Sequence, residues 1–492
     1  MFAEYRSHGI EDCFAANFEV RQRVSPSSRY YRNVGSFYVE NFGCRATQAD
    51  GAAIEQQFRE RGLDRAERAC EAEVVVLNTC TVTAAADNDA RAAIRRIHRE
   101  NPNCQIVVTG CYAQRAPEEI AALPGVAQVI GNSHKHHLAE IASRTFVPLA
   151  QLDDRLTMDE RPIFVSDIFA HTELLAAPVF DAANERTRPN LKVQDGCDNR
   201  CSFCVIPYVR GNSRSLPLSR ILEEVDSLVA AGYREVVISG INLGRWGRDL
   251  GRQDTLPNLI SAILEHTSLE KLRISSVEPM DWNNDLIGLI TKSARIAKHA
   301  HVPMQSGSDR VLRGMHRKYR PWHYREKIER IRAALPYAAI GADVMVGFPG
   351  ESDADFEETR RMVEALPLTY LHVFTYSPRP GTPAAEMRDQ VSVRIARDRN
   401  QALREAGAQK KLMFMRSLVG KTVEAITLKS CGDARTNQLE ALGGRTAGTE
   451  ALTDNYLKLR LDENLQPNRW LLARVEGIRD GVLFGEVLPR AA

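Results

Sequence analysis

An α/β protein with three folded regions in series is expected from this sequence: a parallel sheet, a part-barrel of parallel strands and a small antiparallel barrel. The chain has 492 residues, which suits about three domains. Hydrophobic residues make up 43% and charged residues 26%, a globular composition that excludes a largely disordered or fibrous chain. Short β-branched runs alternate with helical segments in two series, and segments with alternating apolar and polar residues follow them.

The first series predicts an N-terminal domain over residues 35–148. Residues 1–34 precede it as a loose extension, because they are rich in Ser, Arg and Tyr and lack apolar periodicity. Between the strands, helical spacing is expected over 48–62 and 86–100. This alternation is typical of a mostly parallel sheet with helices on its faces. The expected strands are 35–41, 72–78, 104–110 and 127–131.

The second series predicts a part-barrel over residues 185–412. Residues 149–184 mix Pro, Asp and isolated apolar residues, and we interpret them as a linker that partly packs. Six successive βα units indicate a partial (βα)6 barrel, whose functional face lies at the carboxyl ends of its strands. The expected strands are 191–195, 235–240, 271–276, 299–304, 340–347 and 372–378.

The last region, residues 413–490, predicts a small antiparallel β-barrel. Four segments alternate apolar and polar residues between Gly or Asp turns, as strands of such a barrel do. They are residues 421–428, 455–462, 469–477 and 481–488.

Overall charge gives no argument for a nucleic-acid partner. Lys and Arg number 65 against 63 Asp and Glu, so the formal charge is +2 and any basic surface must be local. No apolar stretch approaches the ~18 residues that span a bilayer, and the first residues do not have the pattern of a secretory signal. Ten cysteines are too few for a disulfide scaffold in a chain of this length. We therefore expect a soluble cytoplasmic protein that does not contact a membrane.

Three cysteines, Cys197, Cys201 and Cys204, directly follow the first expected strand of the part-barrel in the motif GCDNRCSFC. Zinc usually takes four ligands in two pairs, and this segment has no fourth Cys or His nearby. Three thiolates on a tight loop suit an iron–sulfur cluster with one iron left open for a small molecule. The alternative is a loop of three structural thiols, although free Cys normally prefers dispersed, buried positions.

This motif resembles the CxxxCx(aromatic)C pattern of the radical S-adenosylmethionine (SAM) superfamily, with Phe203 in the aromatic position. The resemblance implies that the three cysteines are catalytic ligands of a [4Fe-4S] cluster. Its open iron would chelate SAM, and electron transfer would cleave SAM to a 5′-deoxyadenosyl radical. Further segments at the strand ends also resemble elements of this superfamily. The alternative explanation for them is ordinary turn chemistry, since Gly and Pro are common in the turns of any βα barrel. The residues implied to bind the cofactor are Phe203, Gly240, Asn242, Ser276, Glu278, Gln305, Gly347 and Glu351.

A second trio, Cys44, Cys80 and Cys111, follows the first three expected strands of the N-terminal domain. Parallel strands end at one edge of a sheet, so these thiols can converge there, although each could instead be a small buried core residue. The surrounding segments NFGCRATQAD, NTCTVT and GCYAQ resemble the cluster-binding segments of the methylthiotransferase family, in the same order and ahead of the same SAM motif. The resemblance runs from about residue 36 to the C-terminus and implies a second [4Fe-4S] cluster on this trio.

Within that family, NTCTVT, KVQDGC and SPRPGTPAA are most similar to the branch that acts on N6-threonylcarbamoyladenosine at position 37 of tRNA. The resemblance implies radical transfer of a methylthio group to C2 of the base, with one cluster as radical source and the other as sulfur source. The same chemistry on N6-isopentenyladenosine-37, or on an aspartate of a ribosomal protein, is the nearest alternative. A non-catalytic iron–sulfur or zinc module that binds RNA is the alternative of another class.

The implied partners are the tRNA anticodon loop and a low-potential electron donor such as flavodoxin or ferredoxin, and we expect a monomer. The C-terminal region resembles the TRAM domain, which binds RNA in relatives. Arg313, Arg317, Lys318 and Arg320 lie among aromatic residues, and such a set can neutralise phosphates and stack on exposed bases. A solvated charged face is the alternative. A second candidate face carries Arg91, Arg95 and Arg99 at four-residue spacing.

Overall fold

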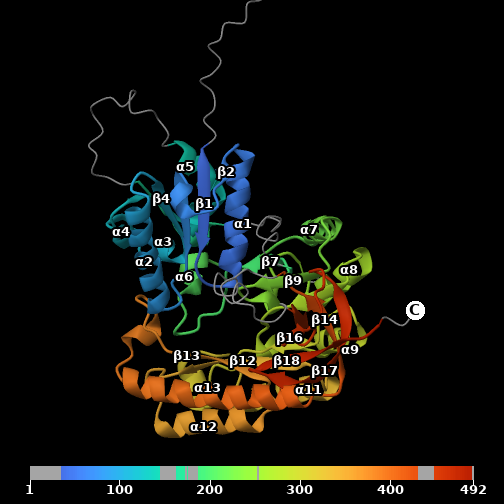
Figure 1. Ribbon diagram of the computed structural model, residues 1–492. Coiled ribbons are helices and arrows are strands. Elements are labelled where there is room, and N and C mark those ends of the chain that lie inside the picture. Colours follow the sequence, from blue (N-terminus) through green and yellow to red (C-terminus); the bar gives the residue numbers. More distant parts are fainter. Residues whose placement is uncertain are drawn as a thin grey trace, which may run out of the picture.

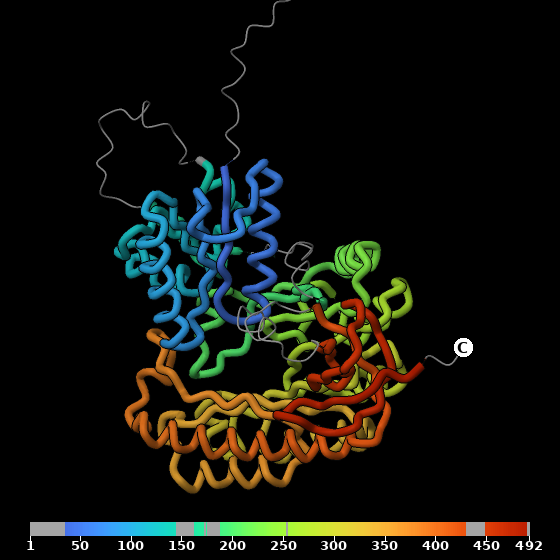
Figure 2. Tube along the Cα trace, viewed as in Figure 1, coloured from blue at the N-terminus to red at the C-terminus, as the bar shows by residue number. Residues whose placement is uncertain are grey.

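The computed structural model describes residues 35–144, 162–171, 174, 187–251, 254–429 and 448–489. The expected extension over 1–34 lies outside the described residues, as does most of the expected linker. Figure 1 shows the N-terminal sheet and its helices in blue, standing on the part-barrel that runs from green to orange. The C-terminal barrel, in red, lies against the side of the part-barrel, and the same arrangement can be followed along the Cα trace in Figure 2.

The N-terminal sheet has six parallel strands in the order β2-β1-β3-β4-β5-β6. The four strands expected from the sequence correspond to β1, β3, β4 and β5. The edge strands β2 and β6 have two residues each, and β6 comes from the stretch expected to be a linker. The strands are β1 (Ser36–Asn41), β2 (Asp64–Arg65), β3 (Val74–Thr79), β4 (Gln105–Gly110), β5 (Val126–Gly131) and β6 (Ile163–Phe164).

Helices cover both faces of this sheet, which is why all six residues of β3 are buried. On one face, Val74 and Val76 pack with Ile54 of α1 and with α5. On the other face, Val75 and Leu77 pack with α2, α3 and α4. The helices are α1 (Arg45–Glu60), α2 (Ala84–Glu100), α3 (Cys111–Arg115), α4 (Pro117–Ala121) and α5 (Leu138–Arg144).

The part-barrel contains the six expected parallel strands in two hydrogen-bonded groups, β10-β9-β7-β8 and β11-β12-β13, where β8 (Arg214–Ser215) is a short antiparallel addition. A parallel bridge between Ser276 and His301 joins the two groups. The six strands are β7 (Asn190–Asp195), β9 (Glu235–Gly240), β10 (Lys271–Ile274), β11 (His299–His301), β12 (Ala339–Val346) and β13 (Tyr370–Thr375).

The apolar core of the part-barrel lies between its strands and the surrounding helices. Leu191 and Val193 of β7 face this core, so alternate residues such as Lys192 point to the inner side. The inner side is therefore polar. The helices are α6 (Ile206–Arg210), α7 (Leu218–Ala230), α8 (Leu256–His266), α9 (Asn284–Lys292), α10 (Asp309–Gly314), α11 (Pro321–Ala334), α12 (Asp353–Ala365) and α13 (Val393–Arg416).

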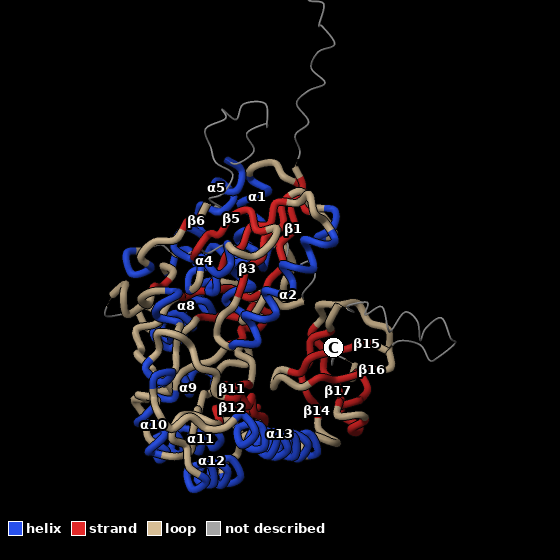
Figure 3. Tube along the Cα trace, turned by 90° about the vertical axis from the view of Figure 1, so that its left-hand side faces the viewer, coloured by secondary structure: helices blue, strands red, loops and turns tan. Residues whose placement is uncertain are grey.

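The C-terminal region forms a closed barrel in the order β14-β15-β16-β18-β17, and Figure 3 shows it beside α13. The expectation of a purely antiparallel barrel is wrong at one seam, because β16 and β18 are parallel. A closed ring of five strands has an odd number of pairs, so at least one pair must be parallel. The strands are β14 (Thr422–Thr427), β15 (Thr449–Thr453), β16 (Lys458–Leu461), β17 (Trp470–Arg479) and β18 (Val482–Val487).

The turn between β15 and β16 connects all three regions. The Tyr456 hydroxyl accepts a hydrogen bond from Arg45 Nη2 of α1 at 3.1 Å, and the Tyr456 ring lies 4.8 Å from the His299 ring of β11. Arg273 Nη1 of β10 donates to the carbonyl oxygen of Asp454 at 2.9 Å. The N-terminal and C-terminal regions thus meet at the polar inner side of the part-barrel. Within the described part of the chain, no helix combines the length and hydropathy that a bilayer crossing requires.

Candidate active site

The loop that carries Cys197, Cys201 and Cys204 follows β7 and is fixed by backbone contacts. The Cys197 amide donates to the carbonyl of Gly211 at 3.1 Å. Ser202, between the second and third cysteine, is buried and donates from its hydroxyl to the carbonyl of Gly314 at 2.7 Å. The loop is therefore held at the carboxyl end of the strands, which is the functional face expected from the topology.

Two polar side chains point at the sulfur atoms of this loop. Asn242 Nδ2 lies 3.6 Å from Cys197 Sγ, and Arg317 Nη1 lies 3.2 Å from Cys201 Sγ. Arg317 also pairs with Glu278. Burial, with the neighbouring Cys201 charge, raises the pKa of Cys204 to about 12. The Cys204 thiol therefore stays protonated at neutral pH unless a bound cation or cluster stabilises its thiolate.

The second trio gathers at the carboxyl edge of the N-terminal sheet. Cys44 precedes α1, Cys80 follows β3, and Cys111 begins α3 directly after β4. Burial raises the pKa of Cys80 to about 12, and the charges of Cys111 and Cys44 act in the same direction. Gly43, at φ +103°, allows a close approach, because a Cβ there would lie 2.9 Å from Cys80 Sγ. The topology thus brings together three residues that are far apart in the sequence.

Both trios are too wide for a single metal ion. Tetrahedral zinc with Zn–S bonds of ~2.3 Å holds its thiolates about 3.8 Å apart. Among the described residues, the groups whose ligand atoms all lie within 4.8 Å of one another include neither trio. A multi-iron cluster spreads its thiolate ligands further than one ion does, so sulfur atoms beyond that limit are compatible with an iron–sulfur cluster at each trio.

The two trios are joined by a direct contact between their helices. Helix α6 begins two residues after Cys204, and its Val209 packs with Val205 and Cys111 in one buried apolar cluster. Asn132 strengthens this contact, because its Nδ2 donates to the carbonyl of Val209 at 2.7 Å and lies 3.6 Å from Cys111 Sγ. The α3–α6 contact therefore sets the position of one trio relative to the other.

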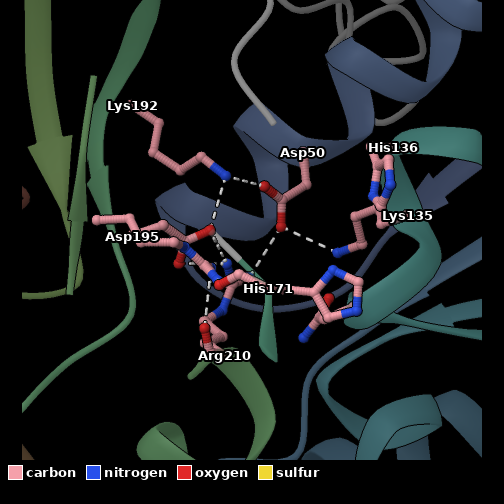
Figure 4. A pocket seen from close by; sticks show the side chains of 9 residues that line it. Asp50, Lys135, His136, His171, Lys192, Asp195 and Arg210 are labelled. Atoms are coloured by element: carbon pink, nitrogen blue, oxygen red, sulfur yellow. Dashed lines mark hydrogen bonds and ion pairs between the residues drawn. The ribbon is translucent and has the colours of Figure 1, made fainter. Parts of the chain in front are cut away.

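A buried charge network lies beside this contact (Figure 4). Arg210, at the end of α6, donates to Asp50 Oδ2 of α1 and to Asp195 Oδ1 of β7, each at 2.9 Å. Lys135 lies 3.0 Å from Asp50, and Lys192 contacts both carboxylates. Three cations thus face two anions, which leaves one positive charge in excess.

Arg210 brings positive charge to the N-terminal trio, because it interacts electrostatically with Cys111 and Cys44. Burial opposes the charged form of Arg210, but Asp195, Cys111 and Asp50 together raise its pKa well above the ordinary value, and Cys44 adds to them. A permanent cation at this place offsets part of the negative charge that thiolate ligands bring into a low-dielectric interface.

The residues implied to bind the cofactor form two groups. Some lie around the cysteine loop, and the others lie further along the strand ends. Asn242 and Glu278 belong to its surroundings, through Cys197 and through Arg317 respectively. The Asn242 Oδ1 atom is buried and has no hydrogen-bond partner among the described residues, so it can accept one from a ligand. Phe203 is half-buried and packs on the part-barrel core, and Gly240 ends β9.

The remaining implied residues lie further along the strand ends. Ser276 forms the bridge to His301, and Gln305 adopts a left-handed conformation with φ +62°. Gly347 follows β12, and its amide donates to Glu351 at 2.6 Å. Glu351 also accepts from Arg399 Nη1 of α13 at 2.7 Å. The carboxylate of Glu351 therefore ties its loop to α13.

The expectation that Arg317 binds RNA is wrong. Arg317 is only 7% exposed and its guanidinium is engaged by Cys201 and Glu278, so it cannot present its charge to a phosphate at the surface. Arg313 and Lys318 are exposed, and Arg313 and Arg320 both pair with Asp309. On the second candidate face, Arg95 and Arg99 are exposed, whereas Arg91 pairs with Glu119.

Sequence reasoning missed the charge network altogether, although α1 carries a signal of it. Ala46, Asp50 and Ile54 lie on one helical face at four-residue spacing, and that face is buried. An aspartate within a buried apolar stripe requires a buried cation nearby. The sequence does not show which cations supply it.

Comparison with known proteins gives two family matches. Residues 36–131 match the model described as "Uncharacterized protein family UPF0004", and residues 191–363 match that of the Radical SAM superfamily. Over 86% of its length, the chain is 37% identical to "Threonylcarbamoyladenosine tRNA methylthiotransferase MtaB" of Aquifex aeolicus (strain VF5), of which 95% is covered.

A second kind of relative is also similar. The chain is 36% identical over 80% of its length to "tRNA-2-methylthio-N(6)-dimethylallyladenosine synthase" of Novosphingobium aromaticivorans, covering 86% of that protein. Among solved structures, the radical SAM methyltransferase TsrM from Kitasatospora setae matches with a TM-score of 0.52 at 14% identity, over 71% of this chain and 76% of that one. This last likeness concerns the fold alone.

Proposed function

Because the chain belongs to the radical SAM tRNA methylthiotransferase family, we propose that it converts N6-threonylcarbamoyladenosine at position 37 of tRNA to its 2-methylthio derivative. Five relatives named as threonylcarbamoyladenosine tRNA methylthiotransferases are 32–37% identical to the chain, and it covers 84–96% of their lengths. The dimethylallyladenosine synthases are covered over 86–88%. Among these relatives, the matches that cover 95–96% of a protein are all to threonylcarbamoyladenosine tRNA methylthiotransferases, which supports the threonylcarbamoyl substrate.

The observation that carries this proposal is the pair of thiol trios joined through the α3–α6 contact. Enzymes of this family use SAM and two [4Fe-4S] clusters, and the chain offers one trio for each. When bound, these groups supply the one-electron cleavage of SAM and a place for the transferred sulfur, chemistry that side chains alone do not provide.

The protein's own residues hold and tune these groups. Cys197, Cys201 and Cys204 would hold the cluster that binds SAM, and Cys44, Cys80 and Cys111 would hold the second cluster. Asn242 and Arg317 orient the first trio, because both direct a donor at its sulfur atoms. Arg210 and the charge network offset negative charge at the second trio. Asn132 and Asp50 of the N-terminal region hold α6 of the part-barrel through Val209 and Arg210, which keeps the two trios on neighbouring elements.

The experiment is nucleoside mass spectrometry of tRNA incubated anaerobically with the reconstituted protein, SAM and a reductant. Transcripts bearing threonylcarbamoyladenosine should gain a methylthio group, and transcripts bearing isopentenyladenosine should not. Methylthiolation of the isopentenyl substrate alone would overturn the proposed substrate but keep the chemistry. If neither RNA is modified by protein that cleaves SAM, the assignment to tRNA is wrong.

Two triple-alanine variants separate the roles of the trios. Replacement of Cys197, Cys201 and Cys204 should abolish SAM cleavage. Replacement of Cys44, Cys80 and Cys111 should leave SAM cleavage intact and abolish sulfur transfer. Normal thiolation by the second variant would contradict this division.

We further propose that the partners are the tRNA anticodon loop and a low-potential electron donor such as flavodoxin or ferredoxin, and that the protein acts as a cytoplasmic monomer. Arg313, Lys318 and Arg320 at the α10–α11 corner, together with the C-terminal barrel, would form the RNA surface. Exposure of Arg313 and Lys318 supports this surface. The salt dependence of tRNA binding tests it, since each lost phosphate contact reduces the slope of log affinity against log salt by about 1.

A further inference from the structure

Three side chains unrelated to the cysteine trios converge on the inner side of the part-barrel. His301 lies on β11, Asp343 on β12 and His372 on β13. Strand register explains the convergence. His301 pairs with Gly341, two residues before Asp343, and Asp343 pairs directly with His372. Residues two apart on a strand share a face, so all three point away from the apolar core, which Ala342 and Val344 face instead.

The spacing of the Asp343 oxygen from each imidazole nitrogen matches the coordination shell of a metal ion. Asp343 Oδ1 lies 3.3 Å from His301 Nε2 and 3.3 Å from His372 Nδ1. These values exceed the usual 2.7–3.2 Å of a hydrogen bond. Ligands at ~2.05 Å from a tetrahedral zinc ion lie about 3.3 Å apart. This is also the one group of His, Cys, Asp or Glu within the described ranges whose ligand atoms all lie within 4.8 Å of one another.

His301 adds an independent indication. It is only 8% exposed, and its Nε2 atom has no hydrogen-bond partner among the described residues. It faces Asp343 Oδ1 at 3.3 Å, a long contact for so buried a nitrogen, and an ion bound between the two atoms would complete the bonding of both. The His372 side chain is 54% exposed, which gives an ion a path to the site.

Tyr370, two residues before His372 on β13, lies beside both imidazole rings. Its ring lies 6.1 Å from the ring of His301 and 5.3 Å from that of His372. Gly341 makes room for it, because a Cβ at that position would lie 2.2 Å from Tyr370 Cζ. The Tyr370 hydroxyl is held in turn by His299 Nε2 at 2.7 Å. The ligands are thus positioned by a second layer of contacts, as is usual at metal sites.

We propose that His301, Asp343 and His372 bind one divalent ion of the zinc class inside the part-barrel, with water in the remaining coordination position. Two imidazole nitrogens and one carboxylate oxygen form the ligand set of zinc sites that keep an open position. The set contains no sulfur and is distinct from both cysteine trios. The inference does not depend on the identity of the tRNA substrate.

The experiment measures zinc binding to the anaerobically reconstituted protein with both cysteine trios loaded. Equilibrium dialysis against micromolar Zn²⁺, followed by elemental analysis, should find one zinc per chain above the loaded iron. His372→Asn and Asp343→Asn should each weaken this binding at least about tenfold, a loss of about 1.4 kcal/mol. The control is His266→Ala, which removes an exposed histidine on α8 and should leave zinc binding unchanged.

Zinc-edge X-ray absorption identifies the ligands. The expected first shell contains only nitrogen and oxygen at ~2.0–2.1 Å, with an imidazole signature that weakens in His372→Asn. A sulfur-containing shell, or equal zinc binding by wild type and both variants, would overturn the proposal. Iron content and the thermal unfolding midpoint confirm that each variant is folded, and His372→Asn is the decisive one because its side chain is the most exposed of the three.

Discussion

Arg210 connects the charges at the domain interface to the N-terminal thiols. It donates to two buried carboxylates, Asp50 and Asp195, and Cys111 and Cys44 contribute to its raised pKa. Buried ions are tolerated only when they are paired, and loss of Arg210 would remove one of the two cations that pair with Asp195 among the described residues. Arg210 therefore acts on stability and on the second trio at the same time.

Arg210→Gln should lower the free energy of unfolding by about 3–5 kcal/mol, the usual cost of breaking a buried ion pair. It should also reduce the iron retained by the N-terminal trio, because the compensating charge is lost. Urea unfolding and iron analysis measure the two effects. Arg220→Gln on α7 is the matched control, since that guanidinium is largely exposed and its pairs with Glu223 and Glu224 are worth at most about 1 kcal/mol.

Arg317→Lys should lower SAM cleavage at least about tenfold. Lys places one compact charge where the guanidinium now reaches both Cys201 and Glu278, so it cannot satisfy both. Production of 5′-deoxyadenosine measures the effect. Arg313→Lys should leave cleavage unchanged, because Arg313 is exposed and pairs with Asp309. A similar loss in both variants would mean that Arg317 has no special role at the cysteine loop.

The sequence predicts where the six cysteines lie relative to the strands, and it does not predict the side chains that surround them. Cys197, Cys201 and Cys204 follow one another closely, so spacing alone reveals them. The sequence groups Arg317 with exposed basic neighbours, because it shows which residues are charged and not which are buried. Lys135 and Lys192 come from different domains, and their meeting at Asp50 depends on how those domains pack.

At the scale of elements, short turns after parallel strands determine where the thiols lie. In the turn between β1 and α1, Gly43 at φ +103° lies against Cys80. A side chain there would meet both a strained backbone and a sulfur atom.

Gly43→Ala should therefore halve the iron content of the reconstituted protein, from about eight to about four irons per chain, by disabling one of two four-iron sites. SAM cleavage should persist. Gly62→Ala is the control, since Gly62 also has a positive φ, +78°, but a Cβ there meets nothing within 4 Å. Both variants carry the backbone strain of about 1–2 kcal/mol, so only the contact with Cys80 distinguishes them. Full iron content in Gly43→Ala would show that the N-terminal trio tolerates displacement.

Long buried elements were predictable, and short edge elements were not. The strands β3 and β4 are β-branched runs with clear bounds. Strands β2 and β6 have two residues each, which is too short for a periodic signal. Strand β15 is not among the predicted strands, because its alternating residues follow a stretch of sequence without apolar periodicity. Once β15 is counted, the closed barrel has five strands, and such a ring must contain at least one parallel pair, which is β16–β18.

At the scale of the whole molecule, Tyr456 links the three regions through Arg45, His299 and the neighbouring Asp454 carbonyl. The order of domains along the chain was predictable from composition and periodicity. Their packing was not, because it depends on single contacts between residues hundreds of positions apart.

Tyr456→Ala should raise the KM for tRNA at least about tenfold, about 1.4 kcal/mol, because the C-terminal barrel loses its anchor in the part-barrel. SAM cleavage without tRNA should remain within about twofold of wild type, since the cysteine loops are untouched. Tyr456→Phe keeps the ring against His299 and loses only the bond from Arg45, so its effect should be smaller. An unchanged KM in Tyr456→Ala would separate the C-terminal barrel from RNA binding.

The bond between Arg45 and Tyr456 joins residues 411 positions apart, so biosynthesis nearly ends before it can form. During translation the N-terminal sheet can fold first, with its thiols open to the cell's iron and sulfide delivery machinery. Docking of the C-terminal barrel, which brings Tyr456 against Arg45 and His299, comes last. We therefore expect buried thiols such as Cys80 and Cys111 to be most accessible for cofactor loading before the three regions have packed together.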